Sequence, residues 1–129
     1  MSGLEDVYRD YLACLNERQL ERLGEYVHDE LTYNGEALSL DGYRALLADD
    51  VARIPDLLFT VDLLVVHGDH VACRLWFDCT PRATFHGIEP DGRRVAFAEH
   101  VFYRFDAGRI AQVWSLIDLD AVRRQLTGG

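Results

Sequence analysis

Basic residues are scarce in this chain of 129 residues: 13 Lys and Arg stand against 22 Asp and Glu, for a formal net charge of −9. Proteins that bind nucleic acid normally carry a basic face, and anionic membrane surfaces attract basic rather than acidic segments. We therefore expect neither nucleic acid nor a membrane as a partner.

Cysteine is also rare, and its three copies are an odd number, which argues against a disulfide framework. Cys73 and Cys79 lie on one expected strand, where about 3.3 Å per residue holds them roughly 20 Å apart, too far to bond. No apolar run approaches the ~18 residues of a membrane-spanning helix, and the acidic start MSGLEDVYRDY lacks the hydrophobic segment of a signal peptide. We expect Cys14, Cys73 and Cys79 to be buried, reduced thiols in a cytoplasmic protein.

Several motifs that identify enzyme classes are missing from the sequence. It has no nucleophile elbow, no phosphate-binding loop and no dinucleotide-binding fingerprint. His67 and His70 flank a turn and His28 precedes a strand, so the histidines do not supply the three convergent ligands of a catalytic zinc. We expect no metal site.

What the chain does contain is a series of apolar stripes whose period changes from helical to alternating. Helices are predicted over 4–15, near 19–26, from Ser39 or Asp41 to the residue before Pro55, and over 118–126. Strands are predicted over 31–34, 57–66, 71–80, 95–105 and 110–117, with a long connection over 81–93. This order predicts one α+β domain over residues 1–129, with helices on one face of an antiparallel sheet.

The last hairpin decides which side chains face the helices. Its turn at Phe105–Arg109 suits a three-residue loop with Gly108 in the left-handed conformation. That register places Glu99 opposite Ser115 on the inner face. A shift of one residue would exchange the two faces.

The two faces have different compositions. The inner side of the predicted sheet, with the first helix and the first strand, should present Tyr11, Tyr33, Phe77, Phe97, Glu99, Val101, Val113, Ser115 and Ile117. The outer side should carry Trp76, Phe102 and Trp114, with His100 packed against Trp114. Three large aromatic side chains make this outer side too apolar to be freely solvated, which predicts a homodimer through it.

Three segments together resemble a known family: DYLACLNERQLERLGEYVHDELTYNG, PDGRRV and HVFYRFDAGRIAQVWSLIDLDAVRRQL. They are similar to the SnoaL-like branch, the polyketide or ester cyclases, of the nuclear transport factor 2-like superfamily. The resemblance implies a cone-shaped α+β barrel, in which a strongly curved antiparallel sheet wraps around three N-terminal helices and is followed by a C-terminal helix. It also implies a pocket for a small apolar molecule, no cofactor, and ring closure of a polyketide ester by an aldol step.

The chain departs from the residues that this resemblance implies. The acid/base Asp of the cyclases falls at Ser115, their assisting His at Val101 and a pocket Asn at Tyr33. Ketosteroid isomerase has a similar fold, and its oxyanion-binding Tyr falls at Tyr11, whereas its base falls at Gly35. The chemistry of neither enzyme is carried over in full.

Glu99 is the candidate that remains. Loss of water in an apolar cavity raises the pKa of a carboxyl group, which would make Glu99 a general base for a proton next to a carbonyl. Tyr11 or Tyr33 would donate to the enolate oxygen, and Ser115 would orient Glu99. Tyr33, Phe77, Phe97, Val101, Val113 and Ile117 would contact the ligand.

Two alternatives stay open. In both of them, Glu99 either pairs with an arginine or reaches the pocket mouth, and the tyrosines are core residues whose hydroxyls are satisfied. The chain is then a binding module that sequesters an apolar metabolite, or a structural dimer with a vestigial pocket.

Three further polar residues have mainly structural interpretations. Asp118 is expected to cap the closing helix. Asp50 interrupts an apolar helical stripe and lies either at the pocket rim or, more commonly for such a residue, in solvent. His86 is in the long connection, where similar chains place residues of the pocket lid.

Overall fold

A computed structural model describes residues 3–127. Its elements in chain order are α1 (Leu4–Asn16), the 3₁₀ helix η1 (Leu20–Glu25), β1 (Val27–Tyr33), β2 (Glu36–Ser39), α2 (Leu40–Arg53), β3 (Thr60–His67), β4 (His70–Cys79), β5 (Val95–Asp106), β6 (Arg109–Ile117) and α3 (Leu119–Thr127).

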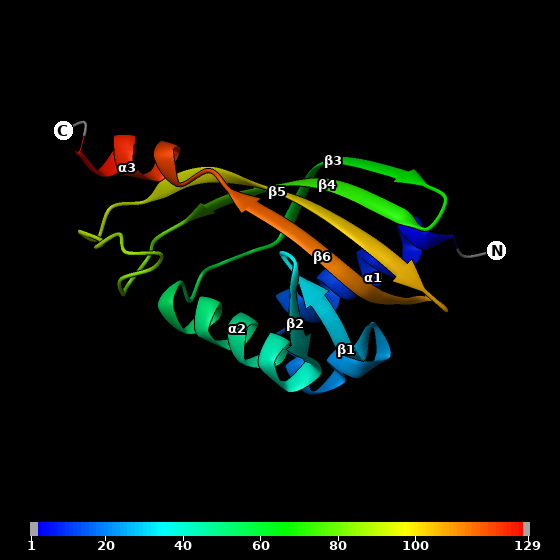
Figure 1. Ribbon diagram of the computed structural model, residues 1–129. Coiled ribbons are helices and arrows are strands. Elements are labelled where there is room, and N and C mark those ends of the chain that lie inside the picture. Colours follow the sequence, from blue (N-terminus) through cyan, green and yellow to red (C-terminus); the bar gives the residue numbers. More distant parts are fainter. Residues whose placement is uncertain (1–2, 128–129) are drawn as a thin grey trace.

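The six strands form one curved sheet in the order β2-β1-β6-β5-β4-β3. The sheet is open, because its two edge strands do not pair with each other. α1, η1 and α2 lie on its concave side, and α3 lies at the far end of the sheet (Figure 1). The predicted α+β cone, with a curved sheet around the N-terminal helices and a helix at the C-terminus, is confirmed.

Local sequence signals account for the helix positions. In α1 the apolar stripe is buried through Tyr8, Tyr11, Leu12 and Leu15. Of the two predicted caps, Ser39 and Asp41, α2 uses Ser39, whose hydroxyl accepts a hydrogen bond of 2.9 Å from the Gly42 amide. Asp118 caps α3 in the same way, with 3.1 Å from the Ala121 amide to its carboxylate.

One hairpin was not predicted. Asn34 and Gly35 both have positive φ (49° and 85°), which is the backbone of a two-residue turn between β1 and β2. β1 also pairs with β6 in parallel, so the sheet is not wholly antiparallel as expected. The Asn34 amide continues this pairing with a hydrogen bond of 2.9 Å to the Val113 carbonyl.

The turn between β5 and β6 differs from the prediction. Ala107 and Gly108 form a two-residue turn with φ of 51° and 81°, and Phe105 pairs with Ile110 rather than with Arg109. A bulge at Ala111, between the Phe105–Ile110 and Arg104–Gln112 pairs, then shifts the register by one more residue. Together, the shorter turn and the bulge move β6 by two residues relative to the predicted register. Side chains alternate between the two faces of a strand with a period of two, so each residue stays on its predicted face.

The predicted residue pairs between β5 and β6 are therefore wrong, although the predicted faces of the two strands are right. Glu99 lies opposite Ile117, and Ser115 lies opposite Val101. His100 is opposite Leu116, and its ring does not stack on Trp114 as expected; His70 does, with 6.3 Å between ring centroids.

Cys14, Cys73 and Cys79 are buried and free, as expected. Between residues 3 and 127, no helix combines the length and the apolar character that a membrane crossing requires.

Candidate functional site

A cavity of about 630 Å³ lies between α2 and the concave face of the sheet. Seven of the predicted side chains line it: Tyr11, Tyr33, Glu99, Val101, Val113, Ser115 and Ile117. Phe77 and Phe97 instead line an adjoining void of about 40 Å³, where their rings are 5.2 Å apart. The cavity reaches solvent, because exposed residues such as Asp49 and His86 form part of its wall.

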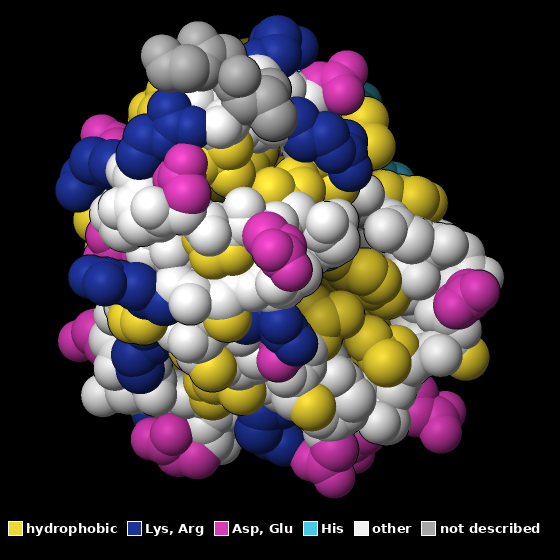
Figure 2. All heavy atoms as spheres, turned by 90° about the vertical axis from the view of Figure 1, so that its left-hand side faces the viewer, with side chains coloured by type: hydrophobic (Ala, Val, Ile, Leu, Met, Phe, Trp, Pro, Cys, Tyr) yellow, Lys and Arg dark blue, Asp and Glu magenta, His cyan; other side chains and the backbone are white. Residues whose placement is uncertain are grey.

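The molecular surface agrees with a mainly apolar hollow. Figure 2 views the side that carries α3 and the 80–94 connection, and it shows hydrophobic side chains gathered in a depression with acidic and basic groups around it.

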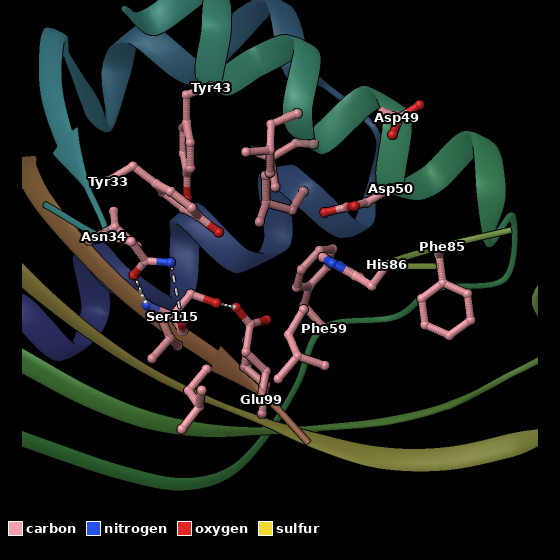
Figure 3. A pocket seen from close by; sticks show the side chains of 18 of the residues that line it. Tyr33, Asn34, Tyr43, Asp49, Asp50, Phe59, Phe85, His86, Glu99 and Ser115 are labelled. Carbon is pink, nitrogen blue, oxygen red and sulfur yellow. Dashed lines mark hydrogen bonds between the residues drawn. The ribbon is translucent and has the colours of Figure 1, made fainter. Parts of the chain in front are cut away.

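Glu99 and Ser115 are joined on the sheet side of the cavity. The Ser115 hydroxyl donates a hydrogen bond to the Glu99 carboxylate (Figure 3). The Asn34 side chain holds the Ser115 backbone from both directions: its oxygen accepts from the Ser115 amide at 2.8 Å, and its nitrogen donates to the Ser115 carbonyl at 3.3 Å. The turn after β1 therefore fixes the residue that orients Glu99.

The surroundings of Glu99 favour its protonated form. Burial raises the pKa of the Glu99 carboxyl, and the hydrogen bond from Ser115 opposes that rise. The surface that Glu99 retains faces the cavity rather than bulk water. Within residues 3–127 no Arg or His forms an ion pair with it, so the predicted alternative of a Glu99–Arg pair is wrong.

A second carboxyl group enters the cavity from the opposite wall. Asp50 extends from α2 toward the space in front of Glu99 (Figure 3). Burial first, and then the charge of Glu99, raise the pKa of Asp50 to about 7. The expectation of a solvent-facing Asp50 is wrong. The spacing along the helix could have indicated this orientation. Asp50 is seven residues after Tyr43 and three after Leu47, both buried on the inner face of α2.

Buried tyrosines form hydrogen bonds with one another through their hydroxyl groups. The Tyr11 and Tyr43 hydroxyls are 2.6 Å apart, and Tyr8 donates to Tyr103 at 3.4 Å. Burial raises the pKa of Tyr11 well above its usual value, so the hydroxyl keeps its proton. Only one of the two protons of the Tyr11–Tyr43 pair is used in their mutual bond. The other is a donor that the cavity can use.

His86 lies at the cavity edge on the 80–94 connection. His86 and Gly87 have positive φ (49° and 76°), which turns the chain between Phe85 and Ile88. Those two flanking side chains are buried and anchor the turn, whereas His86 is exposed and points toward the cavity (Figure 3). His86, which the resemblance placed among residues of the pocket lid, thus lines the cavity from this connection.

Arg53 also lines the cavity, but its charge is already engaged. Its Nε is 2.8 Å from the Asp49 carboxylate, and its guanidinium donates to the Thr84 carbonyl. In the part of the chain that the structure describes, no group of three or more His, Cys, Asp or Glu side chains could hold a metal ion. The groups of the cavity that could act on a bound ligand are therefore carboxyl, hydroxyl and imidazole groups.

Comparison with known proteins places this arrangement in a family. The family profile described as SnoaL-like polyketide cyclase matches residues 5–126. The chain belongs to the SnoaL-like polyketide cyclase family. Among curated proteins, the search found no significant match.

Solved structures agree with this family. A SnoaL-like polyketide cyclase from Agrobacterium tumefaciens strain C58 is 45% identical, with a TM-score of 0.94 over 98% of this chain and 99% of that chain. TsrD from Streptomyces laurentii is 28% identical, with a TM-score of 0.84 over 97% and 95%. IdmH, a putative polyketide cyclase from Streptomyces antibioticus, shares the fold at 24% identity, with a TM-score of 0.85 over 97% and 99%. These three structures share the fold of this chain over nearly its whole length.

Proposed function

We propose that this SnoaL-like protein binds a small, largely apolar carbonyl compound and transfers a proton at the carbon next to the carbonyl, with Glu99 as the base. One observation carries the proposal: the Glu99 carboxyl faces the cavity, receives a hydrogen bond from Ser115 and has no cationic partner in residues 3–127. A carboxylate that has lost water accepts a proton more readily, and its pKa approaches the working pH.

The proposed step needs no cofactor. Glu99 takes the proton from the α-carbon, and the electron pair of that C–H bond forms the enolate. Tyr33, or the unused proton of the Tyr11–Tyr43 pair, donates to the enolate oxygen. In a polyketide-like substrate the enolate carbon then attacks a second carbonyl of the same molecule, which closes a ring.

A non-catalytic binding module is the second candidate. It is favoured by the two positions at which the resemblance to cyclases implies His and Asp, because they hold Val101 and Ser115. Both candidates bind the same ligand in the same cavity and differ only in turnover. The three buried, free cysteines support a cytoplasmic location for either.

The experiment that separates the two candidates uses 2-tetralone, an uncharged bicyclic ketone. Proton NMR in D₂O would follow the exchange of its α-protons with and without the protein. Acceleration beyond an equal concentration of serum albumin supports the enzyme. Saturable binding without acceleration supports the binding module.

Ser115→Ala tests the positioning of Glu99. Removing the hydroxyl takes away the hydrogen bond that lowers the pKa of Glu99, so that pKa should rise further and the acid limb of the pH–rate profile should move to higher pH. We expect the exchange rate at pH 7 to fall by about 10- to 100-fold, because one charge-assisted hydrogen bond is worth roughly 1.5–3 kcal/mol. Ser115→Thr should restore most of the rate. An unchanged pH profile would show that Ser115 has no such role.

We also propose a homodimer through the outer face of the sheet. Its exposed apolar side chains form one patch across four strands: Leu63, Val65, Trp76, Phe102, Trp114 and Leu116. A contiguous patch of this kind on a surface strand face is typical of a protein interface. A second copy is the partner we propose, because the same patch on both copies can pair about a twofold axis.

Phe102→Glu tests this dimer. Phe102 is 55% exposed near the middle of the patch, so a charge there would have to be desolvated in the interface. Light scattering after size-exclusion chromatography should give the dimer mass for the wild type and the monomer mass for Phe102→Glu. Leu58→Glu is the matched control, since Leu58 is also 55% exposed but lies outside the sheet. A monomeric wild type contradicts the proposal.

A further inference from the structure

We propose that Asp50 is a second catalytic residue, and that Asp50 and Glu99 work across the cavity as two carboxyl groups holding one proton between them. Neither residue falls at the position of the cyclase Asp, which is Ser115 here. The inference rests on the proposed function, because it divides the acid and base roles of that reaction between two side chains.

Geometry is the first support. Asp50 comes from α2 and Glu99 from β5, on opposite walls of the same cavity, and both also border the adjoining void. Figure 3 shows their carboxyl groups directed into the space between α2 and the sheet. A carbonyl compound in that space would have one carboxyl on each side.

The absence of a neutralising cation is the second support. Among residues 3–127, the Asp50 carboxyl receives no hydrogen bond and forms no ion pair, whereas neighbouring Asp49 is paired with Arg53. The charged or titratable groups that face Asp50 are Glu99 from β5, Asp49 and Arg53 from α2, His86 from the 80–94 connection, and the phenols of Tyr33 from β1 and Tyr43 from α2. The charge of Arg53 lowers the pKa of Asp50, but its guanidinium is bound to Asp49 and to the Thr84 carbonyl rather than to either member of the pair.

Two carboxylates that share a desolvated site resist double ionisation, because the second negative charge is repelled by the first. The pair therefore loses its protons in two separated steps, and the steps belong to the pair rather than to either residue. Burial and the charge of Glu99 act in this direction on Asp50. Between these two steps the pair contains one carboxylate and one carboxylic acid.

That protonation state suits enolisation and ring closure. The carboxylate takes the proton from the α-carbon, the C–H electron pair forms the C=C bond, and the carbonyl oxygen takes the proton of the carboxylic acid. The resulting enol carbon then attacks a second carbonyl carbon, whose oxygen receives the first carboxyl's proton. The enol hydroxyl returns its proton to the other carboxyl as its C=O re-forms. The pair ends with one proton, and nothing else is consumed.

The same pair defines the substrate class. A substrate carboxylate in the cavity would add a second negative charge beside a pair that already carries one, and Arg53 is already bound to Asp49 and Thr84. The reacting part of the substrate is therefore an uncharged ketone or ester. The matched probes are methyl 4-oxocyclohexanecarboxylate and its free acid, and we expect the ester to bind at least tenfold more tightly at pH 7. Equal affinity would overturn this assignment of substrate class.

The catalytic test compares D50N, E99Q and the double variant in the 2-tetralone exchange assay. We expect each single variant to lose at least about 100-fold in rate, the usual contribution of one acid or base. The double variant should be little worse than either, because the two groups act as a unit. D41N is the control on the same helix: Asp41 makes the same charge change but is exposed and paired with Arg44.

A substrate-free measurement keeps the pair testable if a variant is impaired for other reasons. Carbon-13 NMR of labelled Asp and Glu side chains should show Asp50 titrating near neutral pH in the wild type and at clearly lower pH in E99Q. Circular dichroism and thermal unfolding would establish that each variant is folded. An Asp50 titration that E99Q leaves unchanged would overturn the carboxyl pair.

The outcomes separate this inference from the function on which it rests. Full activity of D50N with loss in E99Q keeps Glu99 as base and rejects Asp50. Full activity of both variants rejects both proposals. An inactive wild type rejects the proposed function and, with it, the catalytic role of Asp50.

Discussion

Replacement of Glu99 by glutamine is expected to slow α-proton exchange of 2-tetralone by about a thousandfold, within the range of one general base. Glutamine has nearly the same shape, and its side-chain oxygen can still accept the hydrogen bond from Ser115. The amide, however, does not accept a proton from carbon near neutral pH. The affinity for 2-tetralone, measured by calorimetry or by NMR line shifts, should therefore stay within about twofold of the wild type, since the cavity walls are unchanged.

The control for this variant is Glu36→Gln, which makes the same chemical change on the exposed edge strand β2. It should leave both rate and affinity as they are. If Glu99→Gln retained the wild-type rate, Glu99 would not be the base. If it lost binding and rate together, the loss of rate would not by itself identify Glu99 as the base.

The second large effect concerns stability and Asp50. Its pKa in the folded protein is raised to about 7 from 3.8, so between these values the folded chain binds more protons than the unfolded chain. The contribution of Asp50 is fully present below the unfolded value and is lost as pH rises toward the folded value. Stability attributable to Asp50 thus falls between about pH 4 and pH 7, and above this window the buried carboxylate is a net cost.

Asp50→Asn should remove that cost. A shift of about three pKa units corresponds to an upper limit near 4 kcal/mol, and we expect about 2 kcal/mol because Asp50 is only half-buried and faces a cavity that reaches solvent. At pH 8 the variant should be more stable than the wild type by that amount. Near pH 4 the two should differ little.

Urea unfolding at several pH values between 4 and 8 measures this difference directly. The difference between wild type and variant is the useful quantity, because other titrating groups cancel in it. Asp41→Asn should show no such pH-dependent gain, since Asp41 is exposed. A constant difference across the whole range would mean that Asp50 does not titrate in this window.

The two faces of the sheet could be predicted because alternation along a strand depends on parity alone. The turn at Gly108 is one residue shorter than predicted and the strand pattern does not reveal the bulge at Ala111, yet Glu99 and Ser115 both face the cavity. Actual neighbours depend on the register itself. The stacking of His70 on Trp114 and the pairing of Glu99 with Ile117 were for that reason not found.

The candidate site was predicted on the sheet side and only partly on the helix side. Strand alternation identified Glu99, Val101, Val113 and Ser115. The role of Asn34 depends on the parallel pairing of β1 with β6, which joins residues 81 positions apart and has no local signal. Hydroxyl partners such as Tyr11 and Tyr43 likewise meet only where two helices converge.

The amino-acid sequence alone determined the class of fold, the helix caps at Ser39 and Asp118, and the face of the sheet on which Glu99 lies, because each follows from local conformational preference or from periodicity. Only the tertiary structure decided that Asp50 faces Glu99 across a cavity, that Asn34 holds Ser115, and that Arg53 is occupied elsewhere. Those facts depend on the distances between distant segments, and charge and desolvation act through such distances rather than through order along the chain.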